Sequence, residues 1–138
     1  MTQPVLDIQQ LHLSFPGFNG DVHALNNVSL QINRGEIVGL VGESGSGKSV
    51  TSKAILGILA GNSIVESGEI FYDGKDLLKI SEEEMCKIRG DKISMIFQDP
   101  LSSLDPIVKI GKQITEAMLL KNKLSRKMGK LEFNSLLE

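Results

Sequence analysis

Eight consecutive residues carry the clearest chemistry in this sequence. They are Gly42, Glu43, Ser44, Gly45, Ser46, Gly47, Lys48 and Ser49, which match the pattern G-x-x-x-x-G-K-[ST] without a departure. Glycines let the backbone wrap so that successive N–H groups point inward and form a nest for an anion. A helix that begins at Lys48 adds the positive end of its dipole. The sequence therefore predicts a phosphate-binding loop in which Lys48 contacts the terminal phosphates and Ser49 is a ligand of Mg²⁺.

The segments on either side of this loop supply the context that the pattern needs. Glu36–Val41 is a compact apolar run of the kind that usually becomes a buried strand of a parallel sheet. Lys48–Leu59 has apolar residues at helical spacing. The alternative is a glycine-rich turn that happens to precede an ordinary surface lysine. The order strand, loop and helix argues against it, so we expect the chain to bind nucleotide phosphates.

The remaining elements follow from patterning and turn chemistry. Asp73-Gly74 predicts a turn directly after a strand. Apolar patterning predicts further strands at Val5–Phe15, Ala24–Ile32, Glu69–Tyr72 and Lys92–Gln98. The last of these is a nearly continuous apolar run, which is typical of a strand buried on both faces. Ser81 and Glu84 form a capping box, which predicts a short helix ending near Gly90. Ile107–Leu120 is amphipathic at helical spacing, whereas the two prolines of Asp99–Pro106 exclude a helix or a central strand there.

Length and composition are those of an ordinary folded domain. The chain has 138 residues, 41% of them hydrophobic and 23% charged. No apolar stretch approaches the ~18 residues of a membrane span, and the first residues have neither the basic region nor the apolar segment of a signal peptide. Cys86 is the one cysteine, so we expect no disulfide framework and no cysteine metal cluster, which fits a reducing cytosol. The net charge of −2 gives no argument for a nucleic-acid partner, and we expect none.

Charge is unevenly distributed along the chain. Residues 1–120 hold 10 basic and 15 acidic side chains, whereas residues 121–138 hold 5 basic and 2 acidic ones. This change divides the sequence into a main part, 1–120, and a basic tail, 121–138. A solvated helix face is the favoured explanation of the tail, and the alternatives are a docking segment, an incomplete helical subdomain or a non-native terminus.

Two strings of residues carry a resemblance to a known family. Ser44–Ser49 (SGSGKS) resembles the phosphate loop of ABC transporter ATPases, and Ile93–Pro100 (ISMIFQDP) resembles the strand and Q-loop of the same family. The longer strings GESGSGKS and ISMIFQDPLSSLDP are similar to those of the ATP-binding subunits of dipeptide, oligopeptide and nickel importers. The resemblance runs in colinear order from about Leu6 to about Leu120. It implies an α/β fold: a P-loop NTPase core with an N-terminal antiparallel β portion.

The resemblance also assigns roles to two residues outside the phosphate loop. Gln98 matches the Q-loop glutamine, which contacts Mg²⁺ and the attacking water, so it is a candidate catalytic and metal-binding residue. Phe15 matches the aromatic residue that stacks on adenine. The alternative for each is an ordinary strand-end side chain. ATP and Mg²⁺ are the cofactors that this assignment implies, while His12 and His23 lack the spacing of a protein metal site.

Three motifs of an ABC ATPase have no match in the printed sequence. They are the LSGGQ-type signature, the apolar Walker B strand ending in Asp-Glu, and the switch histidine. The sequence therefore looks like the N-terminal part of such a subunit, truncated before the signature and Walker B elements. It leaves open whether the chain is an enzyme, and we expect no ATP turnover by these 138 residues alone.

The partners that the resemblance implies belong to an importer. They are the transmembrane permease subunits and a second ATPase subunit in a head-to-tail dimer, with the chain bound peripherally at the cytoplasmic face of the membrane. The transported solute, a peptide or a related small molecule, is not specified by this chain, because other subunits select it.

Two further classes of function remain as alternatives. One is a nucleotide-binding P-loop module with no role in transport. The other is a small P-loop kinase with Asp99 as its metal-binding acid. Gln98 interrupts the apolar run before Asp99, and no glutamate adjoins that aspartate, which argues against the kinase. A GTPase is disfavoured because Asn122-Lys123 lacks the aspartate that would read guanine.

Overall fold

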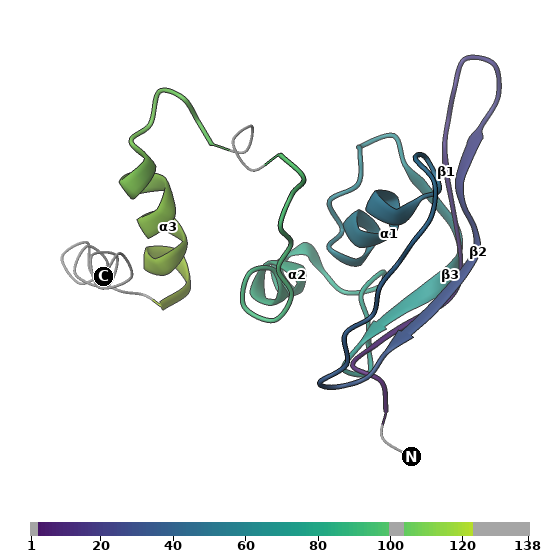
Figure 1. Ribbon diagram of the computed structural model, residues 1–138, viewed down its shortest axis with the longest axis horizontal. Helices are drawn as coiled ribbons and strands as arrows, with labels where there is room; N and C mark the ends of the chain where they lie inside the picture. Colours follow the sequence, from purple (N-terminus) through teal and green to yellow (C-terminus); the bar gives the residue numbers. More distant parts are fainter. Residues whose placement is uncertain (1–2, 100–103, 123–138) are drawn as a thin grey trace. The chain divides into compact units, whose positions relative to one another are not determined.

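A computed structural model describes residues 3–99 and 104–122 (Figure 1). The chain forms two units, Met1–Ser94 and Met95–Glu138, which are described separately below. Most of the basic tail and residues 100–103 lie outside the described residues. In the part of the chain that the structure describes, no helix is long and apolar enough to cross a membrane.

The first unit is built on an antiparallel sheet with the strand order β2-β1-β3-β4. The strands are β1 (Leu6–Phe15), β2 (Val22–Ile32), β3 (Ile64–Tyr72) and β4 (Lys75–Asp76). The first two confirm the strands predicted from alternation. The strand β3 begins five residues earlier than expected, because Ile64 and Val65 pair with the end of β1. Asp73 and Gly74 both have positive φ and form the predicted two-residue turn between β3 and β4.

Two helices of this unit contribute to the same hydrophobic core as the sheet. They are α1 (Lys48–Ile55) and α2 (Glu82–Ile88), which supply the buried residues Ala54 and Met85. The core is completed by residues from the strands and from the segment after β4, namely Leu6, Ile8, Leu11, Leu13, Leu25, Ile70 and Leu77. The helix α2 begins as predicted, with the Ser81 hydroxyl accepting a hydrogen bond of 3.3 Å from the Glu84 N–H.

The two strands predicted to be buried in a parallel sheet are absent, and this prediction is wrong for the described structure. Glu36–Val41 is neither helix nor strand, and Ile37 and Val41 are 98% and 92% exposed. In Lys92–Gln98 the sole sheet-type contact is an isolated parallel bridge between Arg89 and Ile93, while Ile96 is 94% exposed. A parallel strand needs hydrogen-bonding neighbours from distant sequence, and the described residues place none beside these segments.

The second unit contains the predicted amphipathic helix, α3 (Ile110–Asn122). It begins three residues later than expected, because Asp105–Val108 forms a turn instead. The Gln113 side chain holds this turn: it donates to the carbonyl oxygens of Asp105 (2.9 Å) and Val108 (2.8 Å) and accepts from the Asp105 N–H (2.9 Å). Asp99 and Leu104–Pro106 are neither helix nor strand, as the prolines predict.

Candidate nucleotide-binding site

The predicted phosphate loop joins the irregular segment Glu36–Val41 to the helix α1. Gly42–Gly47 is irregular, and Lys48 and Ser49 are the first two residues of the helix. Gly45 and Gly47 have φ angles of 82° and 87°, which L-residues with a side chain rarely adopt. The free N–H groups of the first helical turn and the helix dipole therefore lie at the loop, as an anion site requires.

Lys48 is the central cation of this loop. Its ammonium group donates hydrogen bonds to the carbonyl oxygens of Gly42 (2.7 Å) and Glu43 (2.6 Å) and to the Ser46 hydroxyl (3.1 Å). The Ser46 N–H also donates to the Glu43 carbonyl at 3.2 Å, which closes the turn. The three protons of the ammonium group are thus directed at loop oxygens, and the positive charge is fixed inside the curve of the loop.

Two glycines permit the close contacts of the loop. A Cβ atom on Gly42 would lie 2.6 Å from the Ser46 hydroxyl oxygen, so a side chain there would displace Ser46 from its place beside Lys48. A Cβ atom on Gly47 would lie 2.7 Å from Leu25 and 2.8 Å from the Ala24 carbonyl oxygen, both on β2. The loop is therefore seated against the sheet at Gly47, and the helix α1 starts from this contact.

The strand ends place Phe15 at the edge of the same region. Phe15 is the last residue of β1, is partly exposed, and pairs with Val22 of β2. Val22 lies two residues before Ala24, which contacts the loop. Phe15 also packs against the hydrophobic core. Its position fits either of the two roles considered from the sequence, so its contact with adenine stays a prediction.

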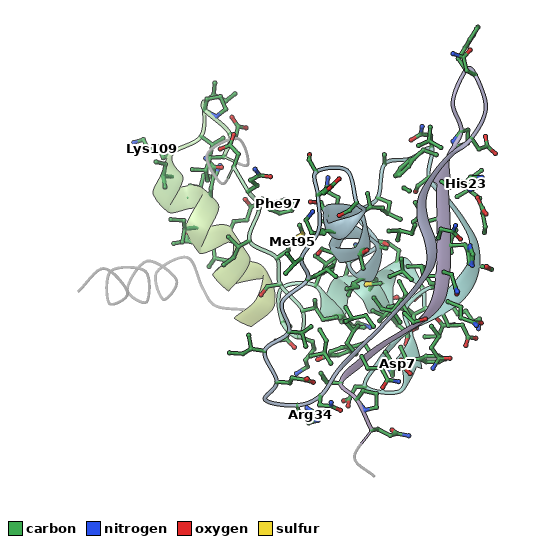
Figure 2. All side chains as sticks on the ribbon, turned by 45° about the vertical axis from the view of Figure 1, so that its right-hand side comes forward. Asp7, His23, Arg34, Met95, Phe97 and Lys109 are labelled. Atoms are coloured by element: carbon green, nitrogen blue, oxygen red, sulfur yellow. The ribbon has the colours of Figure 1, made fainter. Side chains whose placement is uncertain are left out.

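A polar cluster that the sequence did not reveal lies on the same strands. The His23 Nδ1 atom lies 3.2 Å from a carboxylate oxygen of Glu66, and Figure 2 labels His23 on β2. A hydrogen bond from the buried Ser14 hydroxyl, and then the nearby His23 and His12, hold the pKa of Glu66 below its usual range. The alternation of apolar and polar residues in the sequence does not predict a contact between Glu66 on β3 and His23 on β2, because β1 lies between these two strands. Among the described residues no group of three or more His, Cys, Asp or Glu side chains could hold a metal ion.

Gln98 and Asp99 lie in the second unit, in the extended segment that also carries Met95 and Phe97 (Figure 2). Both are exposed. The structure brings Phe15, the phosphate loop and Lys48 into one unit. It assigns Gln98 to the other, so the role of Gln98 stays a prediction.

A glycine loop wrapped around a lysine at the start of a helix defines this chain as a P-loop protein. Its sequence matches the family described as ABC transporter over residues 25–136, and the chain belongs to that family.

Curated relatives support this assignment. A probable D,D-dipeptide transport ATP-binding protein of Escherichia coli K12 is 56% identical over 139 residues, which cover 100% of this chain and 42% of the relative. An oligopeptide transport ATP-binding protein of Bacillus subtilis 168 is 44% identical over 135 residues, covering 97% of this chain and 38% of the relative. The chain thus spans about two fifths of the length of these relatives.

A solved structure gives the same fold. The ATP-binding cassette MJ0796, in a dimeric post-hydrolysis state bound to ADP and Pi, superposes with a TM-score of 0.79 at 25% identity. The alignment covers 94% of this chain and 54% of that protein. The prediction of a P-loop NTPase core with an antiparallel β portion is confirmed by this likeness.

Proposed function

We propose that Gly42–Ser49 binds ATP with Mg²⁺, and that the chain acts as part of the ATPase subunit that drives import of peptides or a related small solute. The observation that carries the proposal is the position of the Lys48 ammonium group, held by loop oxygens at the N-terminus of α1. The names of the relatives, which are dipeptide and oligopeptide transport ATP-binding proteins, supply the class of transported solute.

Several residues of the loop fit the triphosphate and its cation. The cradle that Gly42 and Gly47 permit leaves backbone N–H groups for phosphate oxygens, and Lys48 supplies a charge that can turn from the Ser46 hydroxyl to a phosphate. The exposed Ser49 hydroxyl is the first candidate ligand of Mg²⁺, and Gln98 is the second. The cation, when bound, neutralises charge that develops on the phosphates.

The partners are proposed on the same basis. They are the transmembrane permease subunits of an importer and a second ATPase subunit, and they would place the chain peripherally at the cytoplasmic face of the membrane. The dimeric state of MJ0796 supports pairing of two such subunits. Membership of the ABC transporter family favours this function over a small P-loop kinase that uses Asp99.

The direct test is the affinity for a fluorescent ATP analogue with Mg²⁺. Lys48→Ala should weaken binding by about 1.5–3 kcal/mol, because it removes a charge-assisted contact with the phosphates. Lys53→Ala is the matched control, since Lys53 is an exposed lysine in the last turn of the same helix. Equal affinities for the wild type and Lys48→Ala would overturn the assignment of the loop.

The role of Phe15 is tested with two ligands. If Phe15 stacks on adenine, Phe15→Ala should weaken the ATP analogue by about 1–3 kcal/mol, the scale of base–aromatic stacking. Tripolyphosphate, which has no base, should bind almost as before. A similar loss for both ligands would show that Phe15 acts through the hydrophobic core that it touches.

A further inference from the structure

The C-terminal end of α1 is held by one side chain from a distant part of the chain. The Arg89 guanidinium donates to the carbonyl oxygen of Leu56 at 2.7 Å and to that of Gly57 at 3.1 Å. It also forms two hydrogen bonds with the carboxylate of Glu82, at the start of α2. Arg89 itself is the residue that caps the end of α2. One guanidinium therefore joins the end of α1 to both ends of α2.

The backbone of α1 leaves these carbonyl groups for Arg89. The helix ends in a Schellman arrangement, in which the N–H groups of Gly57 and Ile58 donate to the carbonyl oxygens of Ala54 (3.0 Å) and Lys53 (3.1 Å). The carbonyl oxygens of Leu56 and Gly57, at the end of the helix, are those that accept from Arg89. A cation at this end also interacts favourably with the negative pole of the helix dipole.

The two ends of α1 are thus fixed by different contacts. The N-terminal end rests on β2 through Gly47 and carries Lys48 and Ser49. The C-terminal end is held by Arg89. The helix has eight residues and is about 12 Å long, and Thr51 and Ala54 bury one side of it. A short, hydrogen-bonded helix moves as one piece, so a change at its C-terminal end alters the orientation of the loop at its N-terminal end.

Backbone hydrogen bonds close a tight turn directly after Arg89. Directly after Arg89, the N–H groups of Lys92 and Ile93 donate to the carbonyl oxygen of Ile88 (2.9 and 3.1 Å). The Gly90 N–H donates to the Ile93 carbonyl oxygen at 2.8 Å. This tight turn ties Ile93 to the end of α2, where Arg89 is anchored. The turn that follows α2 therefore begins beside the residue that holds the C-terminal end of α1.

We infer that Arg89 is a positioning residue for nucleotide binding: it touches no ligand but holds α1 so that Lys48 and Ser49 are correctly oriented towards the phosphates. This inference rests on the proposed function of the loop. The inference depends on the hydrogen bonds to the two carbonyl oxygens and not on the ion pair with Glu82. The Arg89 side chain is 24% exposed, whereas that of Glu82 is 73% exposed, and an ion pair with an exposed partner contributes little to stability.

Four variants test this positioning role against a purely structural one. Arg89→Ala removes all the contacts, Arg89→Lys keeps the charge with a single donor group, and Glu82→Gln removes the ion pair alone. Lys87→Ala is the control: Lys87 is an exposed cation of α2 that pairs with Glu83 and contacts neither carbonyl oxygen. Each variant is compared with the wild type by titration of the fluorescent ATP analogue with Mg²⁺, and by hydrogen–deuterium exchange of Ser46–Ile55.

We expect Arg89→Ala to weaken binding about 2- to 30-fold, the range found for residues that act on a site without contacting its ligand. Exchange in Ser46–Ile55 should become faster, while exchange in β1 and β3 stays unchanged. Arg89→Lys should restore part of the affinity, Glu82→Gln should change it less than Arg89→Ala does, and Lys87→Ala should leave it unchanged.

Two results would overturn the inference. One is a folded Arg89→Ala chain with wild-type affinity and wild-type exchange in α1. The other is faster exchange throughout the sheet, because a general loss of stability is not positioning. If Arg89→Ala does not fold, the affinity and the exchange of Arg89→Lys and Glu82→Gln are compared with those of the wild type in the same way. If the wild type does not bind the analogue, the proposed function fails and the positioning role for nucleotide fails with it, whereas exchange in α1 still shows whether Arg89 holds the helix.

Discussion

The four-stranded sheet and the segment Glu36–Val41 are both rich in aliphatic residues, yet they differ in hydrogen bonding and in burial. Leu11 and Leu13 of β1 are fully buried, and β1 pairs along its length with β2 on one side and β3 on the other. Ile37 and Val41 are almost fully exposed, and their segment pairs with no strand in the described ranges. Apolar content alone therefore does not decide which segment enters a sheet.

The difference follows from where the partners of each segment lie in the sequence. The strand β2 follows β1 after a short turn, so β1 and β2 pair through a local hairpin. An apolar run such as Glu36–Val41 requires partners on both edges and cover on both faces, all from distant residues. Local pairing completes the antiparallel sheet within the described residues, whereas the two runs suited to a parallel sheet are not paired with any named strand there.

The largest expected contrast is in stability. Leu11→Ala should lower the free energy of unfolding by about 2–5 kcal/mol, because it leaves a cavity beneath a side chain that is 0% exposed. Leu40→Ala makes the same chemical change at a side chain that is 50% exposed and should alter stability by no more than about 0.5 kcal/mol. Urea unfolding of both variants measures the two changes. Equal losses would mean that Glu36–Val41 is packed in solution and that the contrast with the sheet is wrong.

A second contrast is in self-association. The exposed apolar side chains of Glu36–Val41, in a segment that belongs to no strand, provide a surface for pairing between copies. We expect the chain to associate as its concentration rises, and the double variant Ile37→Thr, Val41→Thr to shift it towards monomer, as measured by sedimentation velocity. The control is Val22→Thr with Ile64→Thr, exposed residues whose backbones already pair with β1. A wild type that stays monomeric throughout would contradict this prediction.

How far the sequence predicts the structure depends on the same distinction between local and distant partners. The cap at Ser81, the turn at Asp73-Gly74 and the phosphate loop are each specified by a few adjacent residues, and all three were predicted. The Arg89 contact with Leu56 joins residues 33 positions apart, and no periodicity or motif indicates it. The Gln113 contacts, which delay the start of α3, are equally invisible in the sequence because a glutamine amide fits a helix surface as well as a turn.

The smallest expected effect is a pH dependence of stability. It arises from polar side chains of the sheet and not from the apolar segments. The pKa of Glu66 is held below its ordinary value of 4.5, chiefly by the Ser14 hydrogen bond and then by the histidines. A carboxylate whose pKa is lower in the folded chain stabilises the fold above its unfolded pKa. That contribution is lost as the pH falls through the folded value.

Glu66→Gln removes this titration while keeping a side chain that can still bond to Ser14. Between pH 7 and pH 3, the thermal unfolding midpoint of the wild type should therefore fall slightly more than that of Glu66→Gln, with the difference developing below about pH 4.5. Asp76 and Glu82, whose pKa values are also lowered, titrate in both chains and cancel in the comparison. Glu83→Gln, at an exposed carboxylate that pairs with Lys87, is the matched control and should follow the wild type. Parallel pH curves for the wild type and Glu66→Gln would show that the cluster around Glu66 does not stabilise the sheet.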